Sequence, residues 1–165
     1  MICIRIIIKN ILVLGSKWKN KHIKINIPRK QNNKNILNYF KKFDLDMLNV
    51  EKKSYNQNYN LKNKKLIGAD LEDLYFLHNF IILNKRIKIL EFGSGWSTFV
   101  ICNALLNNKI KLNKQSNSIR QTEKFSCCVI ETSKKYLDIT KRRIKNTNKN
   151  KQIKIHYNLT GVNLI

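Results

Sequence analysis

The sequence predicts an α/β fold, a partial doubly wound sheet of about three parallel strands with flanking helices, preceded by an irregular N-terminal region. Three observations lead to this prediction. Short apolar runs typical of buried strands alternate with longer runs at helical spacing between residues 69 and 159. A glycine turn, Gly93-Ser94-Gly95, joins the first such strand to the next helix. The chain has 165 residues, of which 42% are hydrophobic, so it is long and apolar enough to bury a core.

The elements follow one another as helix, strand, helix, strand, helix and strand. Asp70 is the expected N-cap of the first helix, and a polar turn over residues 84–86 ends that helix. Ser97 or Thr98 opens the second helix, and a polar insertion over residues 107–124 follows it. Strands that alternate with helices in this way form a parallel sheet with crossover connections. The expected helices span residues 69–83, 96–106 and 132–146, and the expected strands span residues 87–92, 125–131 and 152–159.

Residues 1–65 are predicted to be an N-terminal extension, irregular in part, and residues 66–165 the ligand-binding domain. Residues 17–65 are mostly polar and offer little apolar periodicity to bury, although residues 36–48 suit a short helix. Charged residues interrupt the apolar N-terminus, so that no uninterrupted apolar run in it is long enough to span a membrane. Two interpretations of that segment stay open: packing on the chain's own domain, or peripheral membrane contact with Trp18 at the headgroups.

The chain is strongly basic, with 33 Lys and Arg against 10 Asp and Glu and a net charge of +23. Such a charge attracts nucleic acid or any other anionic surface. However, Lys, Asn and Ile make up nearly half of the chain and share A/T-rich codons, and aromatic residues do not interleave with the lysines as in a base-stacking surface. Compositional drift is therefore the favoured explanation, and nucleic-acid binding is the alternative.

The cysteines and histidines form no recognisable metal or catalytic group. There is no Cys-x-x-Cys pair and no histidine at metal-ligand spacing, so neither a zinc site nor a disulfide framework is expected. We expect a cytoplasmic protein with reduced, mostly buried thiols, with histidines at the surface or in packing roles, and with no identifiable catalytic residue. These residues are Cys3, Cys102, Cys127 and Cys128, and His22, His78 and His156.

The ends of the first two strands predict a ligand site. Parallel strands end at the same edge of a sheet, and ligands of open α/β sheets bind outside that edge. The first strand ends at the glycine turn, and the second ends at Glu131. Backbone N–H groups of the turn and of the following helix can hold an anionic group, and an acid in the second position can accept hydrogen bonds from a ribose. We therefore expect the turn and Glu131 to face one cleft.

At these positions, "LEFGSGWST" and "CVIETS", the chain resembles the class I S-adenosylmethionine-dependent methyltransferases, over residues 69–158. The resemblance implies a Rossmann-like fold in which the turn holds the methionine part of S-adenosylmethionine and Glu131 binds the ribose hydroxyls. It also implies that helix 69–83 covers the cofactor. The cofactor-binding residues that it implies are Glu91, Gly93, Ser94, Gly95, Trp96 and Glu131.

Two other interpretations of the turn are less favoured. A nicotinamide-binding domain would need a third glycine at the position of Thr98 and a ribose-binding acid about 20 residues further on, whereas Glu131 comes much later. A turn used only for strand–helix packing would not account for the acid two residues before Gly93 or for the strand that ends in Glu131.

Two departures from the methyltransferase pattern shape the expected function. The insertion lengthens the first crossover, and the sequence ends soon after the third strand, whereas a full methyltransferase core has seven strands. We therefore expect a methyltransferase or a truncated relative, active or inactive, with at most weak affinity for S-adenosylmethionine and with self-association through an unpaired sheet edge. The alternative is a non-enzymatic basic protein that binds nucleic acid or an anionic surface.

Overall fold

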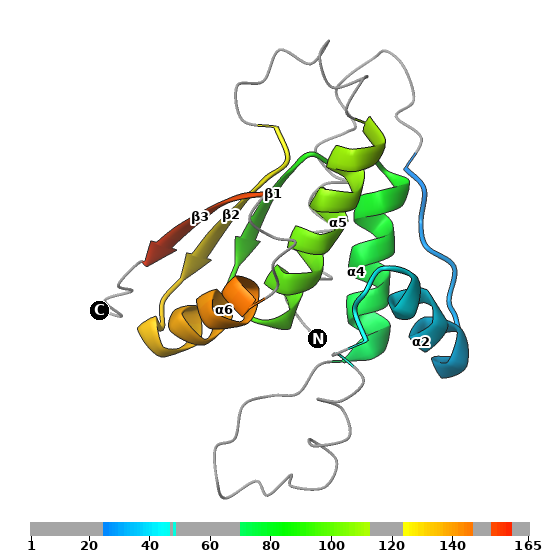
Figure 1. Cartoon of the computed structure of the whole chain (residues 1–165), viewed down its shortest axis with the longest axis horizontal. Helices are drawn as coiled ribbons and strands as arrows, with labels where there is room; N and C mark the ends of the chain where they lie inside the picture. The colour runs from blue at the N-terminus through cyan, green and yellow to red at the C-terminus, as the bar shows by residue number, and fades with distance from the viewer. Residues whose placement is uncertain (1–24, 47, 49–69, 113–123, 147–152, 160–165) are drawn as a thin grey trace, which may run out of the picture.

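The structure is a computed structural model, and it describes residues 25–46, 48, 70–112, 124–146 and 153–159. Its three strands form one parallel sheet in the order β1-β2-β3, with a helix in each connection, which confirms the predicted α/β class (Figure 1). The strands are β1 (Lys88–Phe92), β2 (Ser126–Glu131) and β3 (Lys154–Leu159). The described helices are α2 (Asn33–Lys42), α4 (Leu71–Leu83), α5 (Trp96–Leu112) and α6 (Lys134–Asn146).

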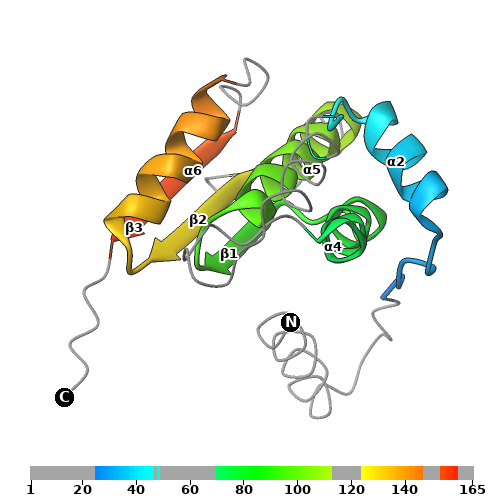
Figure 2. The same ribbon diagram turned by 90° about the horizontal axis from the view of Figure 1, so that it is seen from below.

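The helices pack outward from one face of the sheet. Helix α5 contacts β1 and β2, and α6 contacts β2 and β3. Helix α4 then packs along α5, and α2 packs against α4 (Figure 2). The core lies between these layers, and α5 is at its centre because most of its first eleven residues are buried.

The two faces of the sheet are covered unequally. Ile89 and Glu91 point to the side on which α5 packs, where Glu91 lies beside Val129 of β2. Leu90 and Phe92 alternate with them and are 53% and 63% exposed. Parallel sheets are usually covered on both faces. Among the described residues, this second face of β1 is left open to solvent.

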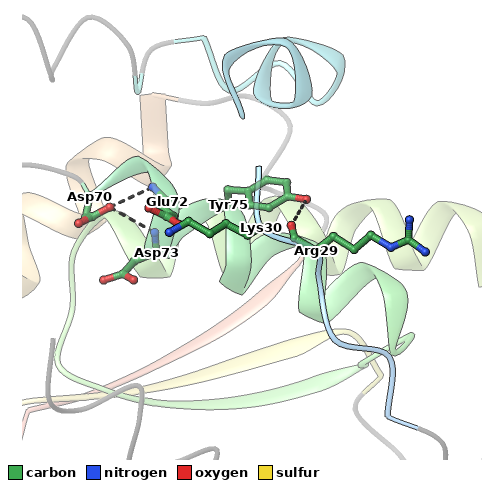
Figure 3. A network of polar contacts seen from close by, with 6 residues as sticks. All are labelled: Arg29, Lys30, Asp70, Glu72, Asp73 and Tyr75. Carbon is green, nitrogen blue, oxygen red and sulfur yellow. Dashed lines mark hydrogen bonds and ion pairs between the residues drawn. The ribbon is translucent and has the colours of Figure 1, made fainter. Parts of the chain in front are cut away.

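Helix α4 begins as predicted, with Asp70 as its N-cap (Figure 3). The carboxylate of Asp70 accepts hydrogen bonds from the backbone N–H groups of Glu72 and Asp73, at 2.9 and 3.3 Å. The segment that precedes α2 is bonded to the same end of α4, because the Tyr75 hydroxyl donates to the carbonyl of Arg29 at 3.2 Å. An exposed ion pair of 3.5 Å between Lys30 and Glu72 lies nearby and contributes little to stability.

Helix α5 is longer than predicted, since it continues to Leu112 and not to residue 106. The reason lies in Asn108, which looks like part of a polar insertion but is 2% exposed. Its side-chain amide donates to the carbonyls of Ile81 and Arg86, at 3.0 and 2.8 Å. These carbonyls belong to the end of α4 and the turn after it, so a polar residue of α5 caps the neighbouring helix.

The short helix expected over residues 36–48 is present as α2, although it begins earlier, at Asn33, and already ends at Lys42. The expectation of little apolar surface to bury in that region is wrong. Ile36 and Phe40 are buried on one side of α2, four residues apart. Leu45 and Leu48, which follow the helix, are also fully buried in the shared core. A turn with Asp44 at φ 56° ends the helix and directs the chain back toward that core.

A buried polar network joins α2, α4 and α5 around His78, which is 0% exposed. The side-chain amide of Asn103 donates to the carbonyl of Phe43, so its oxygen faces the histidine and accepts from Nε2 at 3.0 Å. Nδ1 of His78 then accepts from the Tyr39 hydroxyl at 2.8 Å. Burial lowers the pKa of His78 to about 4, and the charge of Lys111 lowers it further, against the hydrogen bond to Asn103. The packing role predicted for His78 is confirmed.

Some predictions fall outside the described residues. They concern the N-terminal segment with Trp18, the residues Cys3 and His22, and positions 113–123 of the insertion. None of the helices in the described ranges is both long and apolar enough to cross a membrane.

The open face of β1 predicts self-association. Replacing Leu90 with lysine should lower the average mass seen in sedimentation velocity at high protein concentration, because it puts a charge in the middle of the exposed apolar surface. The free energy of unfolding should change by no more than about 0.5 kcal/mol. The matched control is Ile110→Lys on α5, since Ile110 is 66% exposed but lies off the sheet. An equal effect of both substitutions would contradict the role of the sheet face.

The neutral His78 predicts a loss of stability in acid. Its folded pKa of about 4 lies below the ordinary 6.5, so the unfolded chain binds more protons, and stability is lost as the pH falls from 6.5 to 4. The difference in unfolding free energy between the wild type and His78→Gln should shrink by about 3 kcal/mol between pH 7 and pH 4. Urea unfolding at several pH values measures this difference. An unchanged difference would show that His78 does not titrate in this way.

Candidate functional site

The glycine turn after β1 is held against β2. Gly93 has a φ of 89°, which L side chains rarely adopt, so glycine is required at this position. Its N–H donates to the carbonyl of Ile130 at 2.8 Å, which continues the parallel ladder one residue beyond β1. The turn therefore begins at the carboxyl edge of the sheet, directly beside the end of β2.

The turn and the acid that ends β2 meet, as expected from the sequence. The Ser94 hydroxyl donates to Oε2 of Glu131 at 2.8 Å. Oε1 of Glu131 accepts from the backbone N–H groups of Thr132 and Ser133, at 2.8 and 2.9 Å. Burial raises the pKa of Glu131, but the hydrogen bonds from Ser133, Ser94 and Thr132 outweigh it and hold the pKa below its ordinary value. Glu131 is thus a fixed, ionised acceptor at the edge of the turn.

The second glycine of the turn starts α5. The N–H of Gly95 donates to the Thr98 hydroxyl at 3.1 Å. In a capping box, the third residue of a helix accepts in the same way from the N–H of the residue before the helix. A Cβ placed on Gly93 or Gly95 would have no atom of the described residues within 4 Å, its chain neighbours aside. The space next to both glycines is therefore open, and another molecule could approach the backbone there.

Glu91 lies beneath the turn and is only 8% exposed. The Ser97 hydroxyl, from the first turn of α5, donates to Oε1 at 2.5 Å, whereas Oε2 is buried and has no hydrogen-bond partner among the described residues. Burial raises the pKa of Glu91 to about 7, the Ser97 and Thr98 hydroxyls oppose this shift, and the negative charge of Glu131 adds to it. A buried carboxyl group with a free oxygen thus lies directly before the glycine turn.

Trp96 differs from the other residues assigned to the site. Its side chain is 7% exposed and packs at right angles against Phe99, with ring centroids 6.0 Å apart. The guanidinium of Arg143, from α6, lies 4.1 Å from the centre of the Trp96 ring. The indole therefore joins α5 to α6 in the core, and only the backbone of Trp96 belongs to the turn.

The structure brings together Glu91, Gly93, Ser94, Gly95 and Glu131, and it adds contacts that the sequence did not predict. Ser97 was expected only to open a helix, yet it is the hydrogen-bond partner of Glu91. The spacing indicates this contact, because a hydroxyl that starts a helix after a tight turn lies close to the end of the preceding strand. A shallow hollow of about 530 Å³ lies elsewhere, on the open sheet face, and its lining includes Leu90, Cys128 and His156 but none of the predicted site residues.

Chemically, the site offers backbone N–H groups at a helix start, an ionised acceptor and a buried carboxyl group around one open turn. Within the described ranges, no group of three or more His, Cys, Asp or Glu side chains could hold a metal ion. In comparisons with family models, curated proteins and solved structures, nothing matches this chain.

Proposed function

We propose that the chain binds S-adenosylmethionine at the turn between β1 and α5 and is a methyltransferase or a relative of one, as its resemblance to the class I family implies. The observation that carries this proposal is the 2.8 Å hydrogen bond from Ser94 to Glu131. It joins the glycine turn to the acid that closes β2, and these are the two elements on which the resemblance rests. A glycine turn used only for packing would not require this contact.

The residues present fit the methionine end of the cofactor. The open space at Gly93 and Gly95 lets a ligand approach the backbone closely. The first N–H groups of α5 have no partner within the helix, and the positive end of the helix dipole favours a carboxylate at this position.

Glu131 fits the ribose end. An ionised carboxylate has about four acceptor positions. The Ser94 hydroxyl and the N–H groups of Thr132 and Ser133 use three of them, and the backbone N–H of Ser94 uses the fourth. The Ser94 hydroxyl can rotate away from Oε2, which leaves that position for a ribose hydroxyl. Because the pKa of Glu131 is held below its ordinary value, the group is charged at neutral pH, and a hydrogen bond to it is stronger than one to a neutral acceptor.

When bound, the cofactor supplies a methyl group on a sulfonium, which an acceptor nucleophile can take by in-line displacement. The contribution of this chain is orientation, which alone can account for much of the rate of such a transfer. The turn would hold the methionine end of the ligand, and Glu131 would hold the ribose end. No described residue is assigned as a catalytic base.

The alternative, a non-enzymatic basic protein, has less support. Lysine occurs on α2, β1, α5, α6 and β3, and is not confined to one element. This spread agrees with compositional drift better than with a surface selected for nucleic acid.

The proposal predicts saturable binding of S-adenosylmethionine in a calorimetric titration. Gly95→Val should weaken binding at least tenfold, because the new side chain occupies the open space beside the turn. Glu131→Gln should weaken it by about tenfold, because it removes a charged acceptor of the ribose but retains an oxygen for the N–H groups of Thr132 and Ser133.

The matched control is Ile110→Val, at an exposed position near the far end of α5. Circular dichroism and urea unfolding check that each variant folds. Equal affinity in Gly95→Val and the wild type would remove the proposed site. No binding of the cofactor, together with nucleic-acid binding that survives physiological salt, would favour the basic-protein alternative.

A further inference from the structure

Glu91 combines two features that no structural role in the fold explains. Its side chain is 8% exposed, and its Oε2 atom has no hydrogen-bond partner among the described residues. A buried ionised carboxylate with a free oxygen is costly, and proteins avoid the cost by supplying either a proton or a positive charge. In this structure, Ser97 satisfies Oε1 only. In the ligand-free protein, the carboxyl group of Glu91 is therefore protonated up to a pH near neutral.

Among the groups that the structure places around Glu91, none supplies a positive charge that would lower its pKa. Burial is the main cause that raises the pKa of Glu91, to about 7, and the carboxylate of Glu131 on β2 adds to it. Cys127 of β2 and Tyr157 of β3 lie on the same side of the sheet as Glu91. A hydrogen bond with Cys102 is the main cause that raises the pKa of Cys127, and burial is the main cause for Tyr157; the charge of Glu91 adds to both. Cys102 of α5 adjoins the same two groups and contributes no positive charge. The hydroxyls of Ser97 and Thr98, both on α5, only partly offset burial.

We propose that a cationic group of the ligand replaces a proton on Glu91, so that the site binds its ligand in exchange for one proton released to solvent. This inference rests on the proposed function, since S-adenosylmethionine carries an ammonium and a sulfonium. Before binding, Glu91 is a neutral carboxylic acid; afterwards it is a carboxylate paired with the cation, and the proton has passed to water. The open space at Gly93 and Gly95, which begins two residues after Glu91 in the chain, gives the ligand access to it.

The exchange makes affinity depend on pH. Below the pKa of Glu91, the ligand must displace a proton, and each unit of pH weakens binding by up to tenfold. Between pH 5.5 and pH 7.0, where an α-amino group is still charged, the affinity of the wild type should rise roughly tenfold. In Glu91→Gln, no proton can be displaced, so the affinity should be weaker at pH 7.0 and nearly independent of pH over the same range.

Calorimetric titration of the full chain with S-adenosylmethionine at pH 6.0, in two buffers of different ionisation enthalpy, counts the protons released. We expect close to one proton for the wild type and none for Glu91→Gln. The matched control is Glu72→Gln, because Glu72 is an exposed acid at the start of α4, away from the turn. It should leave the released proton unchanged.

The outcomes separate the two proposals. Binding without proton release in the wild type, or equal release in Glu91→Gln, would overturn the exchange and leave the proposed function standing. Absence of any saturable binding would overturn the proposed function and the exchange with it. Carboxyl ¹³C NMR of the free protein gives an independent check, since a Glu91 that is fully ionised at pH 6 would refute the exchange whatever the cofactor does.

Discussion

The parallel pairing of β1 with β2 is the constraint on which the rest of the structure depends. It places Phe92 beside Ile130, and the N–H of Gly93 extends the same ladder. Both strands must then end at one edge, so the turn after β1 and the acid after β2 are neighbours although 36 residues or more separate them in the sequence. The chain must also return across the sheet between the strands, which puts α5 at the centre of the core.

The sequence was most informative where one local rule decides the outcome. The limits of β1 and β2 follow from short apolar runs bounded by polar residues and glycine, and Asp70 begins α4 because its side chain can bond to nearby N–H groups. Prediction from the sequence failed where contacts between distant segments determine the local structure. Asn108 is polar in any local pattern, and only the carbonyls at the end of α4 explain why it is buried and helical. Likewise, the burial of α2 depends on a face of α4 that the sequence does not identify.

The candidate site shows the same division. Residue types and spacing predicted Glu91, the glycines and Glu131, and the structure brings them together. They could not predict that the pKa of Glu91 is raised and that of Glu131 lowered, because this depends on which oxygen finds a donor and how deeply each group is buried. Nor could they predict that the ring of Trp96 is buried against Arg143, because that residue comes from a later helix.

The network around His78 has a consequence for how the protein opens. Helix α2 is the outermost layer, and Tyr39 and the carbonyl of Phe43 link it to His78 and Asn103. If α2 detaches while the sheet stays folded, His78 regains contact with water and can take up a proton, so acid favours that partly open state. Acid should therefore favour the detachment of α2, the helix that covers His78, before the sheet unfolds.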